Sequence, residues 1–81
     1  MDRIAVKSSS VRALRYLDDS QTLEVEFLPR KSGQIDVWQY VGVERQVFDA
    51  MVSGEISVGS KLAEIKRTPY ILAERVQDSG A

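Results

Sequence analysis

The spacing of the apolar residues changes at Gly42, and no other feature restricts the fold more. Before Gly42 the apolar residues alternate, most clearly in residues 22–28, where Leu23, Val25 and Phe27 share one face as in a half-buried strand. After Gly42 they recur at spacings of three and four, as on one face of a helix. The sequence therefore predicts a small α+β domain, in which an antiparallel β-meander of three to four strands is followed by two or three short helices.

The alternating half of the chain is predicted to form three strands, over residues 11–17, 22–28 and 34–41. Turn-forming residues at 18–21 make the first two strands an antiparallel hairpin, and Pro29 ends the second strand because proline cannot donate to the ladder. Alternation puts Val11 on the same face as Ala13 and on the opposite face from Leu14.

The charged residues of this hairpin should face one another across the strands. Arg12 or Arg15 is expected opposite Glu24 or Glu26, as pairs of charges on a solvated face. Exposed pairs of this kind contribute only about 0.2–1 kcal/mol each, so they are not expected to decide the fold.

The helical half is predicted to hold helices over residues 44–53 and 57–67. Gly54 follows the first helix as a left-handed C-cap, and Ser57 caps the second. Thr68-Pro69 has the form of a helix start, so residues 68–76 are read as a third short helix, although their composition also suits a strand.

Length and composition fit one globular domain. The chain has 81 residues, of which 43% are hydrophobic and 28% are charged. The domain is expected over residues 1–76, followed by a flexible tail over 77–81. No apolar run approaches the roughly 20 residues of a membrane span, and the first residues do not form a signal peptide, so the expected location is the cytoplasm.

The chain contains no cysteine and no histidine. Disulfides, thiolate nucleophiles, imidazole bases and the usual ligands of zinc, copper and iron are therefore excluded. No serine lies in a nucleophile elbow, no glycine loop is built to hold phosphate, and the carboxylates of Asp18 and Asp19 diverge in a turn. The sequence predicts a protein that is not an enzyme and that uses no cofactor, metal or small-molecule substrate.

Trp38 and Tyr40 lie two residues apart and should share one face of the third strand. We interpret the pair first as part of the core. The alternatives are a platform that stacks on bases or peptides and an oligomer interface. All three interpretations stay open, because both faces of this strand carry large apolar side chains.

Basic residues offer a second surface for a partner. Eleven Lys and Arg stand against twelve Asp and Glu, and this balance argues against a protein that grips nucleic acid over a wide area. A modest phosphate-contacting patch would use five basic residues together with Trp38 or Tyr70 as stacking partners: Arg30, Lys31, Lys61, Lys66 and Arg67. The plainer interpretation of these charges is a solvated surface.

A series of short motifs runs in a recognisable order through residues 4–70. The series is Ser9-Ser10-Val11, Tyr16, Leu23-x-Val25-x-Phe27, Trp38-x-Tyr40-x-x-Val43, Val47-Phe48, Ser57-x-Gly59, Ile65-Lys66 and Tyr70. Their order and spacing resemble the KTSC domain, a family named for its occurrence at the C-terminus of some lysyl-tRNA synthetases. The family also looks like a common stand-alone small protein of bacteria and phages. The resemblance implies a strand meander followed by short helices, and a loose association with RNA-handling machinery.

The sequence departs from the family pattern in three places. Glu44 stands where the family usually has proline, Leu62-Ala63 stands where an aromatic–asparagine pair is usual, and the loop over residues 29–33 looks longer than the family's tight turn. If the missing asparagine binds a ligand in the family, that role is not carried over to this chain.

These observations predict a non-enzymatic interaction module, a phage or bacterial accessory protein that binds a protein partner. Self-association through a strand edge is also expected, since a three-stranded sheet leaves its edges unpaired. The alternative is a nucleic-acid-binding module that uses a basic helix face and aromatic residues. The two hypotheses differ in whether the basic residues converge on one face of the fold.

Overall fold

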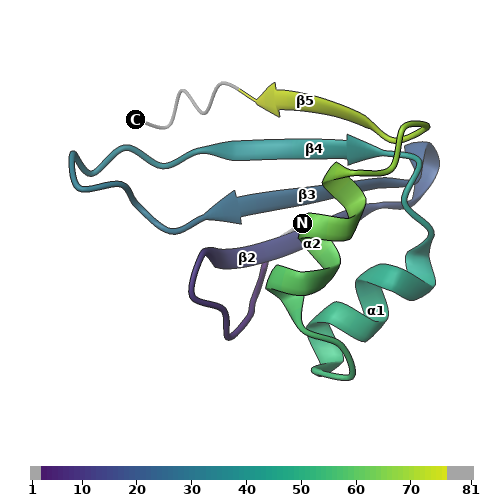
Figure 1. Cartoon of the computed structure of the whole chain (residues 1–81), viewed down its shortest axis with the longest axis horizontal. Helices are drawn as coiled ribbons and strands as arrows, with labels where there is room; N and C mark the ends of the chain where they lie inside the picture. The colour runs from purple at the N-terminus through teal and green to yellow at the C-terminus, as the bar shows by residue number, and fades with distance from the viewer. Residues whose placement is uncertain (1–2, 77–81) are drawn as a thin grey trace.

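The computed structural model describes residues 3–76, which form a five-stranded antiparallel sheet with two helices over one face (Figure 1). The elements in chain order are β1 (Ile4–Ala5), β2 (Val11–Leu17), the 3-10 turn η1 (Asp18–Ser20), β3 (Thr22–Phe27), β4 (Val37–Val41), α1 (Arg45–Ser53), α2 (Val58–Lys66) and β5 (Leu72–Val76). The strands lie in the sheet in the same order as in the chain. The α+β prediction is confirmed, with one strand more than the largest number expected; the predicted tail lies outside the described residues.

The β2–β3 hairpin forms as predicted, but its first strand contains a β-bulge. The register shifts between Val11, which lies opposite Phe27, and Ala13, which lies opposite Glu26, so β2 carries one extra residue there. The bulge turns Val11 into the core beside Leu14, and both side chains are almost completely buried. The prediction that Val11 shares a face with Ala13 is therefore wrong, because strict alternation fails at a bulge.

Both predicted helices are confirmed, together with their caps. Gly54 ends α1 in the left-handed conformation with φ of 85°, and the Ser57 hydroxyl accepts a hydrogen bond from the Ser60 amide at the start of α2. Of the residues described, neither helix has the length and apolar character needed to cross a membrane.

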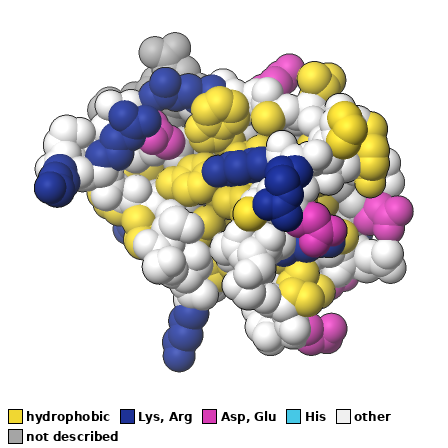
Figure 2. Space-filling view, viewed as in Figure 1, with side chains coloured by type: hydrophobic (Ala, Val, Ile, Leu, Met, Phe, Trp, Pro, Cys, Tyr) yellow, Lys and Arg dark blue, Asp and Glu magenta, His cyan; other side chains and the backbone are white. Residues whose placement is uncertain are grey.

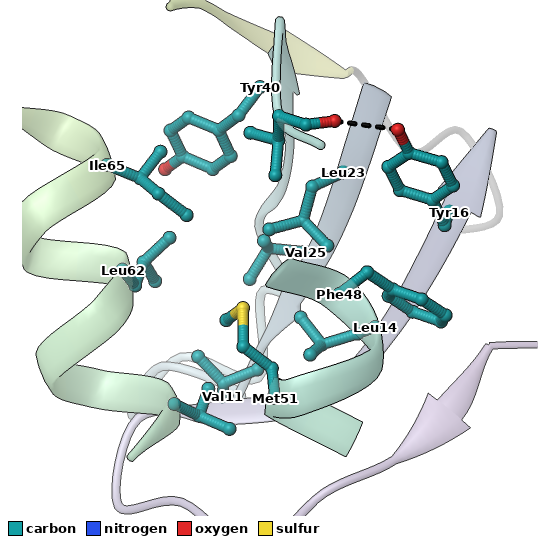
Figure 3. Close-up of a cluster of buried hydrophobic side chains, with 12 residues drawn as sticks. Val11, Leu14, Tyr16, Leu23, Val25, Tyr40, Phe48, Met51, Leu62 and Ile65 are labelled. Carbon is teal, nitrogen blue, oxygen red and sulfur yellow. Dashed lines mark hydrogen bonds between the residues drawn. The ribbon is translucent and has the colours of Figure 1, made fainter. Parts of the chain in front are cut away.

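The core lies between the helices and one face of the sheet (Figure 3). Tyr16 stacks on Phe48 of α1 with ring centroids 5.6 Å apart, and its hydroxyl donates a buried hydrogen bond of 2.7 Å to the Val43 carbonyl. Tyr40 points from β4 toward Ile65 of α2 in Figure 3 and is only 2% exposed. For Tyr40 the structure therefore shows core packing, the first of the three interpretations.

The segment predicted as a third helix is strand β5, so that part of the prediction is wrong. Thr68 closes α2 instead of opening a new helix: its amide donates to the Ile65 carbonyl and its hydroxyl to the Glu64 carbonyl. Pro69 prevents the helix from continuing. The chain then returns along β4, with Leu72 opposite Val41. Pairing with β4 satisfies a row of backbone groups, and this long-range gain outweighs the local helix signal.

The face of the sheet away from the helices carries a row of polar side chains in register, with Arg15 of β2, Glu24 of β3, Gln39 of β4 and Glu74 of β5 as its members. Glu24 is only 1% exposed and accepts hydrogen bonds from Arg15 at 2.9 Å, from Gln39 at 2.9 Å and from Arg3 at 2.8 Å. The predicted pairing of Arg15 with Glu24 is present, but the pair is not solvated as expected. Long side chains crossing the sheet exclude water from Glu24.

Candidate functional site

Basic and aromatic side chains gather at the end of the sheet where β3 leaves for β4. In Figure 2, Lys and Arg side chains lie over the β3–β4 loop and over α2, with apolar surface between them. We call this surface the basic–aromatic face, and its residues are Phe27, Arg30, Trp38, Lys66 and Arg75, with Lys31 next to Arg30 in the loop and Arg67 next to Lys66 at the end of α2. It brings together a strand end, a loop, a helix end and strand β5, which lie far apart in the sequence.

The aromatic part of this face is Phe27 and Trp38, which are half-buried and pack against the core. Trp38 lies between Val25 of β3 and Arg75 of β5 in the register of the sheet. The Lys66 ammonium lies 5.3 Å from the centroid of the Phe27 ring, within the range of a cation–π contact. A positive charge is therefore held directly over an aromatic surface.

The guanidinium part of this face is organised by Asp36. One carboxylate oxygen of Asp36 accepts from Arg30 at 2.7 Å, and the other accepts from Arg75 at 3.1 Å. Gln34 donates to the second oxygen as well, at 3.2 Å. The Asp36 side chain is 14% exposed, whereas those of Arg30 and Arg75 are 59% and 53% exposed. One shielded carboxylate thus holds two arginines side by side, and each presents further N–H donors to solvent.

Not all the residues predicted for a binding site meet on this face. Arg30, Trp38 and Lys66 belong to it, and Lys31 and Arg67 follow Arg30 and Lys66 in the chain, while Tyr40 lies in the core. Lys61 forms an ion pair of 3.1 Å with Glu64 and lines a separate pocket of about 220 Å³. Tyr70 lines the same pocket and is 78% exposed. Lys61 and Tyr70 therefore form no part of the basic–aromatic face.

Sequence reasoning missed Arg75 and Phe27 as members of this face. The sequence places Arg75 in the predicted third helix, and only its pairing opposite Trp38 shows where it lies. The alternation of β3 places Phe27 on the same face as the core residues Leu23 and Val25, but Phe27 is only partly buried. Treating residues 72–76 as a strand antiparallel to β4 would have placed Arg75 beside Trp38.

A second and larger hollow lies between the β1–β2 loop and the α1–α2 turn. It has a volume of about 730 Å³ and is lined by serine, glycine and apolar residues together with Lys7. The Ser8 hydroxyl in its rim accepts from the amides of Ser10 and Val11, which is the local role expected of a serine turn. Across residues 3–76 there is no group of three His, Cys, Asp or Glu side chains that could hold a metal ion.

A family model of the KTSC domain matches residues 7–60, more than half of the chain. The chain belongs to the KTSC domain family. The match confirms the resemblance seen in the sequence, over a shorter span than residues 4–70. It includes Phe27 and Trp38, whereas Lys66, Arg67 and Arg75 follow it.

The fold recurs in the crystal structure of a KTSC domain protein from Yersinia pestis. The TM-score is 0.64 over 93% of this chain and 96% of that chain, with 23% sequence identity. At this identity the likeness shows a common fold. A search of curated proteins found no match.

Proposed function

We propose that this KTSC domain protein is a non-enzymatic module that binds single-stranded nucleic acid through the basic–aromatic face. The observation that carries the proposal is the convergence of basic residues from the β3–β4 loop, α2 and β5 around two half-buried aromatic rings. Proteins that hold single strands combine a basic surface that follows the backbone with aromatic side chains that stack on bases.

Each part of the face has a distinct role in this proposal. Arg30 and Arg75, held together by Asp36, bind phosphate oxygens with their outward N–H groups. Lys31 at the loop tip adds a further charge. Lys66 moves from the Phe27 ring to a phosphate, and a base then stacks on the aromatic surface that it leaves.

A net charge of −1 is compatible with this proposal because the basic residues of the basic–aromatic face outnumber Asp36, the acidic residue that pairs with two of them. Asp18 and Asp19 lie in the β2–β3 turn, and Glu44 and Asp49 lie on α1 or at its start, away from the β3–β4 loop. The footprint is small, so we expect moderate affinity with strong salt dependence. Three or four phosphate contacts correspond to a slope of log K against log salt of about −2 to −3 for a single strand.

Fluorescence anisotropy with labelled single-stranded RNA and DNA of mixed sequence, over a salt series, tests the proposal. Lys66→Ala and Arg30→Ala should each weaken binding several-fold and make the salt slope shallower by about 0.7. Lys7→Ala removes the same charge from the β1–β2 loop and should leave binding unchanged. Binding that does not respond to salt, or equal losses in all three variants, would overturn the proposal.

A protein partner, the leading expectation from the sequence, is a second candidate. The observation that favours it is the exposure of two large apolar side chains two residues apart in the chain, Tyr70 at 78% and Leu72 at 65%. Tagged protein can be used to capture partners from bacterial lysate with and without nuclease. A band that survives nuclease and is lost in Leu72→Ser supports a protein partner; a band that disappears with nuclease supports nucleic acid.

We also propose the cytoplasm as the place of action, supported by the absence of cysteine. Cell fractionation with an epitope-tagged chain tests this. Recovery from the periplasm or the membrane fraction would contradict it.

A further inference from the structure

Strand β5 is an exposed sheet edge. It is the last strand in the sheet order, and four of its five residues are exposed, including Leu72 at 65%. The opposite edge, β1, is only two residues long. Unpaired backbone groups along an edge strand can pair with a further strand, and β5 offers the longer row.

The backbone groups of β5 that point outward follow from the register. Across β3 and β4, the Phe27 amide donates to the Asp36 carbonyl at 2.9 Å and the Gly42 amide donates to the Gln21 carbonyl at 3.0 Å. In an antiparallel sheet successive residues turn their backbone groups to opposite neighbours. Gln39, three residues after Asp36, therefore turns its groups toward β5.

The same alternation can now be followed into β5. Gln39 lies opposite Glu74, and the neighbouring inward pairs are Val41 with Leu72 and Val37 with Val76. The remaining two residues of β5, Ala73 and Arg75, direct their N–H and C=O groups away from β4.

We propose that β5 pairs antiparallel with β5 of a second copy of this chain, about a two-fold axis normal to the sheet. Ala73 then lies opposite Arg75 of the second copy, and the reverse pair follows by symmetry. Ala73 and Arg75 each turn one N–H and one C=O outward, so the two copies together have four such residues. In this register every one of these N–H groups lies opposite a C=O group of the other copy. Leu72 lies opposite Val76 of the second copy, which covers an exposed leucine with an apolar side chain.

The residue on the two-fold axis is Glu74, which lies opposite Glu74 of the second copy. Like charges directly across a strand pair are destabilising, so the native dimer is expected to be weak. The axis leaves the helices of both copies on the same side of one continuous sheet. Two basic–aromatic faces then lie on one surface, although dimerisation itself does not depend on nucleic-acid binding.

Sedimentation equilibrium over a concentration series, without nucleic acid, is the first test. Ala73→Pro removes an outward N–H and leaves the pairing with β4 intact, so it should give a folded monomer. Ala73→Ser keeps the N–H and should dimerise like the native chain. Glu74→Gln removes the repulsion at the axis and should tighten the dimer several-fold. A native chain that stays monomeric at high concentration, or an Ala73→Pro chain that dimerises like the native chain, would overturn the proposal.

A cross-linking test stays informative even if Ala73→Pro unfolds. Because the native chain has no cysteine, a single introduced cysteine can form a disulfide only with the same cysteine of a second chain. Residue 74 meets itself as a non-hydrogen-bonded pair with Cα atoms about 4.5 Å apart, which suits a disulfide. Glu74→Cys should therefore form a disulfide dimer under mild oxidation, and Ala73→Cys, which does not face itself, should do so poorly. Equal cross-linking of the two variants would contradict this register.

Discussion

At the residue scale, Glu24 shows how a charge becomes part of the interior of a small domain. Burial alone would raise the pKa of its carboxyl, but hydrogen bonds from Gln39, Arg15 and Arg3 more than offset burial and lower the pKa below the ordinary value of 4.5. The folded state thus stabilises the ionised form of the Glu24 carboxyl more than the unfolded chain does. Without its partners, a charge this deeply buried would oppose folding.

Replacement of this residue tests that account. Glu24→Gln leaves Arg3 and Arg15 without their shared carboxylate and should lower the free energy of unfolding by about 2–3 kcal/mol in urea titrations at neutral pH. Glu26→Gln is the matched control and should cost less, because the ion pair of Glu26 with Arg3 is longer, at 3.4 Å. Equal losses in both variants would show that Glu24 has no special role.

The pH dependence follows from the same lowered pKa. Because the folded pKa of Glu24 lies below the unfolded value of 4.5, the contribution is complete above that value and is lost as the pH falls through the folded pKa. The difference in stability between the native chain and Glu24→Gln should therefore shrink in acid. Urea titrations at a series of acidic pH values measure this difference, and a gap that stays constant would refute the linkage.

At the scale of the elements, two glycines with different surroundings give opposite predictions. Gly42 joins β4 to the helices with φ of 103°, and a Cβ there would lie 3.7 Å from the Tyr70 carbonyl oxygen. Gly42→Ala should cost about 1–2 kcal/mol, since an L side chain is strained in this conformation. Gly59 lies in α2 with nothing near its Cβ position, so Gly59→Ala should stabilise the protein by about 0.5 kcal/mol. Thermal unfolding of the two variants measures both changes in stability. Two changes of the same sign would contradict the prediction that Gly42 is required by its backbone conformation and Gly59 is not.

At the scale of the whole molecule, the two helices lie between β4 and β5 in the chain, while β5 completes the sheet that they cover. The last strand of the sheet therefore comes from a segment that follows the helices in the chain. The family match ends at residue 60, so β5 lies outside the part of the chain that identifies the family. We expect the domain to need β5 nevertheless, because removing this strand exposes the backbone groups of β4.

Truncation tests the predicted boundary of the domain at residue 76. A chain ending at Val76 keeps every strand found in residues 3–76 and should unfold cooperatively, with a midpoint close to that of the full chain. A chain ending at Tyr70 lacks β5 and should lose cooperative unfolding, because β4 becomes a bare edge beside the core. Circular dichroism during heating distinguishes the two. A cooperative transition in the shorter chain would show that β5 is not needed for the fold.

The sequence by itself determined the hairpin, both helices, their caps and the family. The hairpin, the helices and their caps depend on contacts between near neighbours, such as Gly54 ending α1 or Ser57 capping α2. The family follows from the spacing of short motifs along the chain. Only the tertiary structure decided the bulge at Val11, the burial of Glu24, the conversion of residues 72–76 into a strand and the meeting of Arg30 with Arg75 on Asp36. These features depend on partners far apart in the chain, and local spacing carries no information about which strand will satisfy a given backbone group or charge.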